Sequence, residues 1–242
     1  MKLGLVSSLM RDHDIEHQLT QMEDYLKSNP GCDILCFGES FLQGFEGLTW
    51  DYEEDLKRAL ALDDPVIRRV QALASQYHSG LSFGFIEKEE GMLYSSYLVI
   101  DTQGEIRDLF RRVSPGWKEH HADDHYREGE GFHTISFDGK VLGTAICGDL
   151  WDDGFLSELQ QVKMDALLWP LYVDYAIGEW EESIRDEYVQ RVKDLPYPVF
   201  MINSFVEDDP HRAKGGCYVF FQNRVIASLP MGETGILEVQ ID

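Results

Sequence analysis

The chain has 242 residues, enough for one large α/β domain, and we expect a single domain over residues 1–242. Its hydrophobic content of 43% is ordinary for a protein with a sizeable core, but its formal net charge of −23 is far from zero. So acidic a surface repels phosphate groups, which argues against binding to nucleic acids and to anionic membrane surfaces.

The cysteines and the apolar segments bear on the compartment. The chain carries four cysteines, Cys32, Cys36, Cys147 and Cys217. Its first residues, MKLGLVSSLMRDHD, hold too short an apolar run for a signal peptide. No segment approaches the roughly 18 apolar residues that a membrane-spanning helix needs. We therefore expect a cytoplasmic protein with free thiols and no membrane partner.

Hydrophobic periodicity predicts helices and strands in the first half of the chain. Apolar residues at helical spacing indicate helices over residues 14–28 and 64–77. The sequence Asn29-Pro30-Gly31 stops the first helix, and Pro65 lies in the first turn of the second. Apolar runs separated by turn sequences predict strands over residues 2–8, 33–37, 81–87, 92–101 and 105–113.

The second half opens with a polar segment, residues 114–131, which we interpret as a loop. A short helix is expected around the apolar Phe155, Leu156 and Leu159, and a long one over residues 179–194. Apolar runs predict strands over residues 133–137, 140–146, 166–169 and 198–202, and a closing meander of residues 218–221, 225–229 and 236–241.

The order of these elements predicts the fold class. Hairpin strands alternate with long helices, which is typical of sheets that helices cover on one side only. Two such sheets packed face to face form an α/β fold with four layers, an α-β-β-α sandwich.

The most informative segment is KVLGTAICGDLWDD, residues 140–153. A buried strand ends there at Cys147 and Gly148, shortly before a helix. A cysteine at such a junction lies near free backbone N–H groups and the positive end of the helix dipole. Both favour the nucleophilic thiolate, and the same N–H groups could bind an oxyanion. Taken alone, the segment is better explained by an inert core cysteine that ends a strand.

Charged residues elsewhere could serve such a nucleophile. Glu39 follows the apolar run DILCF, and ligand clefts form at the carboxyl ends of strands in α/β sheets. Partial burial would raise the pKa of Glu39 and suit it as a general base. Arg112 ends a strand and Lys118 lies in the next loop, where a cation could stabilise a thiolate and an oxyanion. Taken singly, each is also explained as a solvated surface charge.

The loop HHADDH, residues 120–125, contains the ligand types of zinc or manganese. Contiguous loop residues rarely converge on one ion, and this spacing differs from that of helical metal motifs such as HExxH. We therefore expect no metal site. The sequence also lacks the GxSxG, P-loop and GxGxxG motifs of serine hydrolases and nucleotide-binding proteins.

In their order and spacing, several segments resemble the nitrilase, or carbon–nitrogen hydrolase, superfamily. DILCFGESFLQGF resembles the family segment in which a strand ends in a catalytic glutamate, and LYSSYLVIDTQGEI is similar to the hairpin that precedes the family's lysine. TAICGDLWDD looks like the cysteine block, in which Asp149 matches a structural aspartate. QRVKDLPYPVFMINS resembles a later helix-then-strand segment, so the resemblance runs along nearly the whole chain.

The resemblance implies an α-β-β-α sandwich with a Glu-Lys-Cys triad and no cofactor. Glu39 would take the thiol proton, Cys147 would attack an amide carbonyl, and the Gly148 N–H with a cation would hold the oxyanion. A water activated by Glu39 would then hydrolyse the thioester. The implied substrate is a small linear amide or an N-carbamoyl compound, and the implied assembly is a homodimer or a larger homo-oligomer.

The family's lysine is the point where this sequence departs from the pattern. Counted from the turn glycine Gly104, that position falls on Arg112, which is always charged and cannot relay a proton. We expect Lys118 to reach in from the following loop, so that Lys118→Ala abolishes turnover while Arg112→Ala mainly damages folding. The alternative is a noncatalytic relative, disabled at Arg112, with a binding or assembly role.

Further residues complete the expected site. A second acidic residue often supports the family's site, and Asp124 is the best match, with Asp123 and Glu128 as alternatives. Trp151, four residues after Cys147, is expected to bind substrate beside Gly148, with a place in the core as its alternative interpretation.

Overall fold

The computed structural model describes residues 1–207 and 211–241. The helices are α1 (Ile15–Ser28), α2 (Tyr52–Arg58), α3 (Pro65–Tyr77), α4 (Asp153–Leu159), α5 (Ile177–Glu179) and α6 (Arg185–Val192). Short 3-10 turns are η1 (Phe45–Gly47), η2 (Pro115–Trp117) and η3 (Cys147–Trp151), and a π turn, η4 (Trp180–Ile184), joins α5 to α6. The strands are β1 (Lys2–Ser7), β2 (Ile34–Cys36), β3 (Gly80–Glu89), β4 (Met92–Ile100), β5 (Ile106–Arg111), β6 (Tyr126–Arg127), β7 (Thr134–Phe137), β8 (Lys140–Thr144), β9 (Ala166–Leu171), β10 (Val199–Asn203), β11 (Cys217–Phe221), β12 (Arg224–Leu229) and β13 (Gly235–Gln240).

The described strands form two sheets, and the central strands of each sheet run parallel to one another. The first has the order β13-β1-β2-β3-β4-β5, and β6 pairs with β4. Strands β1, β2 and β3 are parallel, and because β4 is antiparallel to both β3 and β5, β5 runs in the same direction as β1–β3. The second sheet has the order β12-β11-β10-β9-β8-β7, with β8, β9 and β10 parallel. Several carboxyl ends therefore lie at one edge of each sheet.

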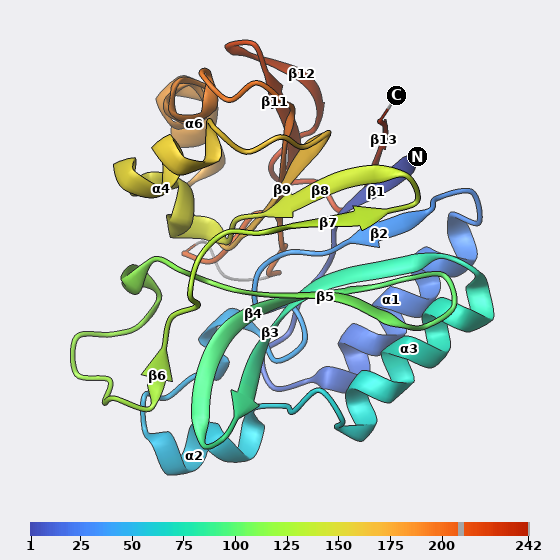
Figure 1. Ribbon diagram of the computed structural model, residues 1–242, viewed down its shortest axis with the longest axis vertical. Helices are drawn as coiled ribbons and strands as arrows, with labels where there is room; N and C mark the ends of the chain where they lie inside the picture. Colours follow the sequence, from blue (N-terminus) through green and yellow to red (C-terminus); the bar gives the residue numbers. More distant parts are fainter. Residues whose placement is uncertain (208–210, 242) are drawn as a thin grey trace.

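Alternation along the strands explains the layers. In β10, Phe200 and Ile202 pack into the core between the sheets, whereas Val199 and Met201 pack into the core under α4 and α6. In β2, Leu35 faces away from the inter-sheet core, into the core beneath α1 and α3. Figure 1 shows α1 and α3 beside the first sheet and α4 and α6 beside the second. The predicted α-β-β-α sandwich is thereby confirmed.

The chain departs from the predicted elements in several places. Strand β13 does not continue the β11–β12 hairpin but pairs antiparallel with β1 in the other sheet, so the predicted closing meander is wrong. Helix α2 forms in a stretch for which no element was predicted; the Asp51 side chain caps its N-terminus. The short helix predicted after Cys147 forms as α4, but the 3-10 turn η3 that precedes it was not predicted.

The ends of the described chain lie side by side. Figure 1 places the N-terminus next to β13, and the amino group of Met1 donates a hydrogen bond to the carbonyl of Ile241 over 3.1 Å. Among the described residues, no helix is both long enough and apolar enough to cross a membrane.

Candidate active site

Four strands deliver side chains or amides to one place. Glu39 follows β2, Arg112 follows β5 directly, Cys147 follows β8, and Tyr172 follows β9 directly. Because β2 and β5 run in the same direction, as do β8 and β9, these positions lie at the carboxyl ends of strands of both sheets. Ligand sites of α/β proteins form at the carboxyl ends of strands. In this protein the two sheets face each other at these strand ends.

Glu39 is buried with one partner on each carboxylate oxygen. Its Oε1 accepts a hydrogen bond from Arg112 Nη1 over 3.0 Å, and its Oε2 accepts one from the Tyr172 backbone N–H over 3.2 Å. Burial raises the pKa of Glu39, while the Arg112 charge and a hydrogen bond with Cys147 oppose that rise. A carboxyl with a raised pKa that still contacts a thiol is suited to exchange a proton with it.

Arg112 lies between the sheets because of its place on the strand. Arg112 stands two positions after Phe110, so its side chain points to the same face as Phe110, which packs in the inter-sheet core. Arg111 points to the opposite face. Arg112 is 5% exposed, and its Nε donates to Ser114 Oγ over 2.9 Å. Burial opposes its charge, but the Glu39 carboxylate raises the pKa of Arg112. The guanidinium is thus a fixed charge.

Cys147 sits on a constrained turn. Its φ of +43° lies in the left-handed region, which costs energy for a residue with a Cβ. The adjoining Trp169 indole donates to the Cys147 carbonyl over 2.9 Å. A Cβ at Gly148 would lie 2.3 Å from Arg112 Nη2, so glycine permits the guanidinium to approach this turn.

The thiolate prediction for Cys147 is wrong for this structure. Burial, followed by the nearby Glu39 carboxylate, raises the thiol pKa to about 12. The expected helix dipole is absent because the five-residue 3-10 turn η3 follows the cysteine in place of an α-helix. The raised pKa disfavours the thiolate, so a Cys147 that acts as a nucleophile needs a base to take its proton.

Asp149 joins the cysteine turn to the arginine segment. It is fully buried and accepts hydrogen bonds from the backbone N–H groups of Ile146, Val113 and Ser114, over 2.8, 3.1 and 2.7 Å. Burial raises the pKa of Asp149. Since Val113 and Ser114 directly follow Arg112, these bonds fix the arginine relative to Cys147, which is a structural role.

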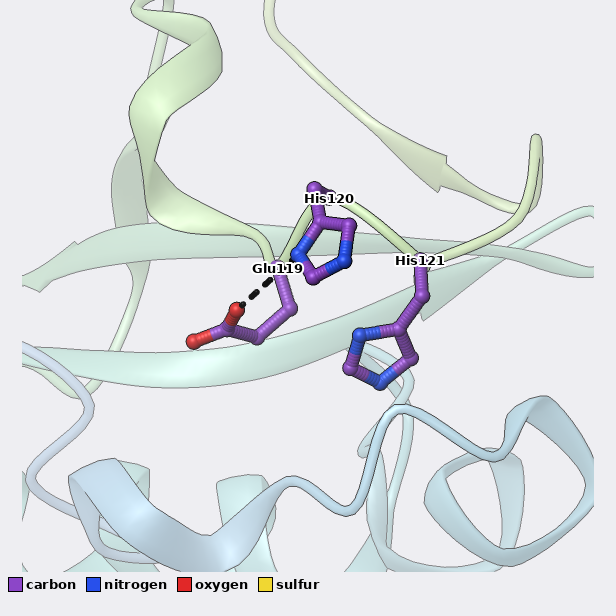
Figure 2. Close-up of side chains that lie close together, drawn as sticks. All are labelled: Glu119, His120 and His121. Carbon is purple, nitrogen blue, oxygen red and sulfur yellow. Dashed lines mark ion pairs between the residues drawn. The ribbon is translucent and has the colours of Figure 1, made fainter.

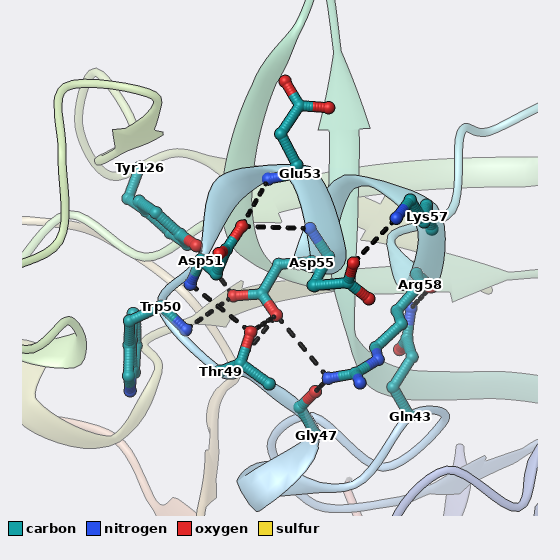
Figure 3. Close-up of polar contacts among 11 residues, drawn as sticks. Gln43, Gly47, Thr49, Trp50, Asp51, Glu53, Asp55, Lys57, Arg58 and Tyr126 are labelled. Carbon is teal, nitrogen blue, oxygen red and sulfur yellow. Dashed lines mark hydrogen bonds and ion pairs between the residues drawn. The ribbon is translucent and has the colours of Figure 1, made fainter.

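Lys118 occupies a different place from the one expected. Its Nζ pairs with Glu128 over 2.8 Å and donates to the Tyr126 carbonyl over 2.8 Å. The phenol of Tyr126 in turn donates to the buried Asp55 over 2.7 Å, in the polar cluster at the start of α2 that Figure 3 shows. The loop is thus anchored toward α2, and Arg112 supplies the cation beside Glu39.

Asp55, to which Tyr126 anchors the loop, is the centre of a larger hydrogen-bonded cluster. Asp55 also accepts bonds from the Thr49 N–H and hydroxyl, both over 2.8 Å, and from the Trp50 N–H over 2.9 Å (Figure 3). A fully buried carboxylate needs such a complete set of donors. Around it pack Trp50, Trp117 and Tyr126, with ring centroids 5.4–6.1 Å apart.

The remaining expected site residues are placed as follows. Asp124 is exposed on the loop before β6, and its expected supporting role finds no contact with Glu39, Arg112 or Cys147 among the described interactions. Trp151 is 43% exposed and packs edge-on against Tyr188, with ring centroids 5.1 Å apart.

The histidine-rich loop gathers Glu119, His120 and His121, whose ligand atoms lie within 4.8 Å of one another (Figure 2). All three side chains are exposed, and Figure 2 shows them on one turn of the loop. His125 instead pairs with Asp123 over 3.0 Å and stacks on Tyr52. The loop therefore divides into two separate groups, and exposed groups of this kind are common without an ion.

Sequence reasoning missed Tyr172 and Ser114. Tyr172 stands directly after the strand Ala166–Leu171, the same signal that singled out Glu39, but the prediction ended that strand at residue 169. The structure continues β9 through Pro170, which pairs with Ile202. The Ser114 hydroxyl accepts a hydrogen bond from Arg112, and its backbone N–H donates one to Asp149. No local sequence pattern predicts these two contacts.

Comparisons with known proteins identify the family of the chain. The family model described as "Carbon-nitrogen hydrolase" matches residues 4–242. The chain belongs to the carbon–nitrogen hydrolase family, and the predicted resemblance is confirmed.

Individual relatives are distant. A probable nitrilase from Schizosaccharomyces pombe is 29% identical over 154 residues, which cover 59% of this chain and 52% of the relative. A cyanide hydratase from Neurospora crassa is 25% identical over 177 residues, covering 66% of this chain and 49% of that protein. The chain thus spans about half the length of these curated relatives.

Solved structures share the fold. A mutant of the amidase from Nesterenkonia sp. AN1, showing Michael addition of acrylamide at the active site cysteine, superposes with a TM-score of 0.79 and 15% identity. The superposition covers 100% of this chain and 93% of the amidase. At this identity the likeness establishes the fold alone.

Proposed function

We propose that this protein hydrolyses a non-peptide C–N bond through a thioester on Cys147, with Glu39 as general base and acid and Arg112 as the fixed cation. The observation that carries the proposal is the buried Arg112–Glu39 ion pair of 3.0 Å, whose glutamate also hydrogen-bonds with Cys147. Perturbed, paired titratable groups next to a nucleophile are typical of catalytic sites.

Acylation begins from the neutral thiol. Glu39 accepts the proton as Cys147 Sγ attacks the amide carbonyl carbon, so the S–C bond forms and the carbonyl oxygen takes the negative charge. Arg112, whose Nη2 faces Gly148, and the backbone N–H of Gly148 stabilise that oxyanion. Concerted removal of the proton is required because the thiol pKa is about 12.

The leaving group and the water use the same carboxyl. Protonated Glu39 gives its proton to the departing nitrogen, the C–N bond breaks, and ammonia or an amine leaves. A water then passes a proton to Glu39 and attacks the thioester, the C–S bond breaks, and the proton returns to the sulfur. Arg112 takes no part in proton transfer because guanidinium stays charged.

The substrate class that we propose is a small linear amide or an N-carbamoyl compound. The site supplies what an amide needs: a proton donor for the leaving nitrogen and a cation for the oxyanion. Relatives named nitrilase and cyanide hydratase make nitriles the natural comparison substrates. The proposal is thus a carbon–nitrogen hydrolase of the amidase type.

The test is intact-protein mass spectrometry after incubation with a panel of linear amides, N-carbamoyl compounds and nitriles. We expect an acyl adduct on Cys147 with at least one amide or N-carbamoyl compound, and free acid in solution. Cys147→Ala should form no adduct. The matched control Cys32→Ala should behave as the parent, since Cys32 is a buried cysteine that packs in the core beneath α1 and α3.

Two results would overturn the proposal. Hydrolysis that survives Cys147→Ala and is lost with a chelator would point to a metallohydrolase. Absence of any adduct or product, in protein whose Cys147 resists iodoacetamide at every pH below 9, would favour a noncatalytic binding protein on the same scaffold.

A further inference from the structure

Arg212, in the segment between β10 and β11, ties together three elements at the rim of the site. Its Nε donates to the Tyr172 hydroxyl over 2.6 Å. It forms ion pairs with Asp12, through Nη1 over 2.8 Å, and with Glu46, through Nε over 3.0 Å. The side chain is 14% exposed, so the guanidinium is largely buried.

Tyr172 connects this guanidinium to the candidate catalytic base. Its ring stacks face to face on Phe45, with centroids 4.2 Å apart and an interplanar angle of 2°. The Arg212 guanidinium carbon lies 5.7 Å from the same ring. At the other end of the residue, the backbone N–H of Tyr172 donates to Glu39 Oε2 and contacts Cys147. The residue is therefore held at its hydroxyl, its ring and its amide.

We propose that Arg212 is a positioning residue that, through the Tyr172 hydroxyl, holds the Tyr172 amide N–H against Glu39 and Cys147. The inference rests on the proposed function, because it assumes that Glu39 serves Cys147. Arg212 itself contacts neither reacting group among the described interactions; it acts on the base through one intervening residue.

The physical consequence concerns the ionised form of Glu39. A hydrogen bond from an amide favours a carboxylate over the neutral acid, and Glu39 has one such bond on Oε2. If Tyr172 loses its anchor, this bond lengthens or breaks, the carboxylate loses stabilisation, and the pKa of Glu39 rises further. The base would then be protonated over a wider part of the acidic range.

The experiment measures the rate of Cys147 alkylation by iodoacetamide as a function of pH, with peptide mapping to isolate this cysteine. In the parent protein we expect the alkylation rate to fall at acidic pH as Glu39 becomes protonated. This fall, the acid limb of the pH profile, should be lost in Glu39→Gln. Arg212→Gln should move the limb upward by roughly one pH unit. Tyr172→Phe keeps the ring on Phe45 but removes the hydroxyl, and should reproduce most of that shift.

The double variant of Arg212→Gln and Tyr172→Phe should shift the limb no further than Arg212→Gln alone, because both changes break one link. Added guanidinium ion should restore the limb of Arg212→Ala toward the parent value. The matched control is Arg69→Gln, which removes an exposed arginine paired with Glu16 over 2.7 Å and should leave the limb in place.

The outcomes separate the two proposals. If Arg212→Gln and Tyr172→Phe are folded, as judged by their melting temperatures, and their limbs match the parent, the positioning role is refuted while Glu39 keeps its role. If Glu39→Gln already shows the parental limb, Glu39 is not the base and the proposed function fails first. If Arg212→Gln does not fold, Tyr172→Phe alone decides.

Discussion

Two adjacent arginines form ion pairs with buried glutamates on opposite faces of the same strand end. Arg111 binds Glu87 through Nε over 2.8 Å and Nη2 over 2.5 Å, and Nη2 also contacts Glu89 over 2.6 Å. Arg112 binds Glu39 through a single hydrogen bond of 3.0 Å. Strand alternation alone sends the first pair outward and the second between the sheets.

The two pairs differ in how fully the glutamate is hydrogen-bonded. Glu87 is bound by both arms of Arg111 and by the Ser96 hydroxyl over 2.6 Å, which is bidentate recognition with an extra donor. Glu39 accepts one bond from Arg112 and one from an amide, and a carboxylate has about four acceptor positions. Glu39 therefore retains capacity for the thiol proton.

The largest effect is expected from Arg112→Ala. The change removes the oxyanion cation, so kcat should fall by about 10²–10³-fold. It also leaves Glu39 buried without its charged partner, which should cost up to about 3 kcal/mol of unfolding free energy. Steady-state kinetics and denaturant unfolding measure the two losses. Wild-type turnover in the folded variant would contradict the catalytic assignment.

Arg111→Ala should separate stability from activity. Breaking this largely buried bidentate pair should lower the unfolding free energy by about 3 kcal/mol. The kcat per folded molecule should stay within about twofold, because Arg111 faces away from Cys147 and packs over Tyr94 at 3.9 Å. Chemical denaturation with active-site titration checks both. A large drop in kcat at full folding would show that the two arginines are not separable.

Gly148→Ala tests the approach of Arg112 to the cysteine turn. The new Cβ would lie 2.3 Å from Arg112 Nη2, so the guanidinium must move, and we expect kcat to fall about tenfold. The matched control is Gly116→Ala, where a Cβ meets nothing within 4 Å and φ is −78°. Equal kinetics for the two variants would refute the proposed contact.

The smallest expected effect is a change in pH dependence, which should distinguish the Arg112–Glu39 pair from the Arg111–Glu87 pair. Burial raises the pKa of Glu39 above its ordinary 4.5, and a base must be ionised, so turnover should fall as pH drops through that raised pKa. Arg112 opposes the rise, so Arg112→Gln should move the acid limb of Cys147 alkylation to higher pH. Arg111→Gln should leave it unchanged. An upward shift in both variants would show a general charge effect.

Much of the fold could be predicted because local patterns specify it. Turn glycines such as Gly91 and Gly104 adopt φ values of +79° and +83°, as hairpins require, and strand periodicity placed Glu39 and Cys147 at strand ends. The destination of β13 could not be predicted, because its pairing with β1 joins residues more than 200 positions apart.

The cation was the part of the site that sequence reasoning placed differently. Lys118 was favoured for its chemistry, but Glu128 and the loop anchored at Asp55 hold it elsewhere. The spacing of two residues between the apolar Phe110 and Arg112 was the sequence feature that indicates an inward-facing arginine. The Arg212–Tyr172 contact spans 40 positions and depends on tertiary packing, which no local pattern encodes.

The catalytic cation is identified by the rate of thioester formation on Cys147 in Arg112→Gln and in Lys118→Gln, measured by quenched-flow mass spectrometry with one reactive amide. Each variant replaces one positively charged side chain with glutamine, whose uncharged amide has a similar reach. We predict that Lys118→Gln acylates at the parental rate and that Arg112→Gln accumulates almost no thioester. Normal acylation in Arg112→Gln together with its loss in Lys118→Gln would show that Lys118, and not Arg112, is the catalytic cation.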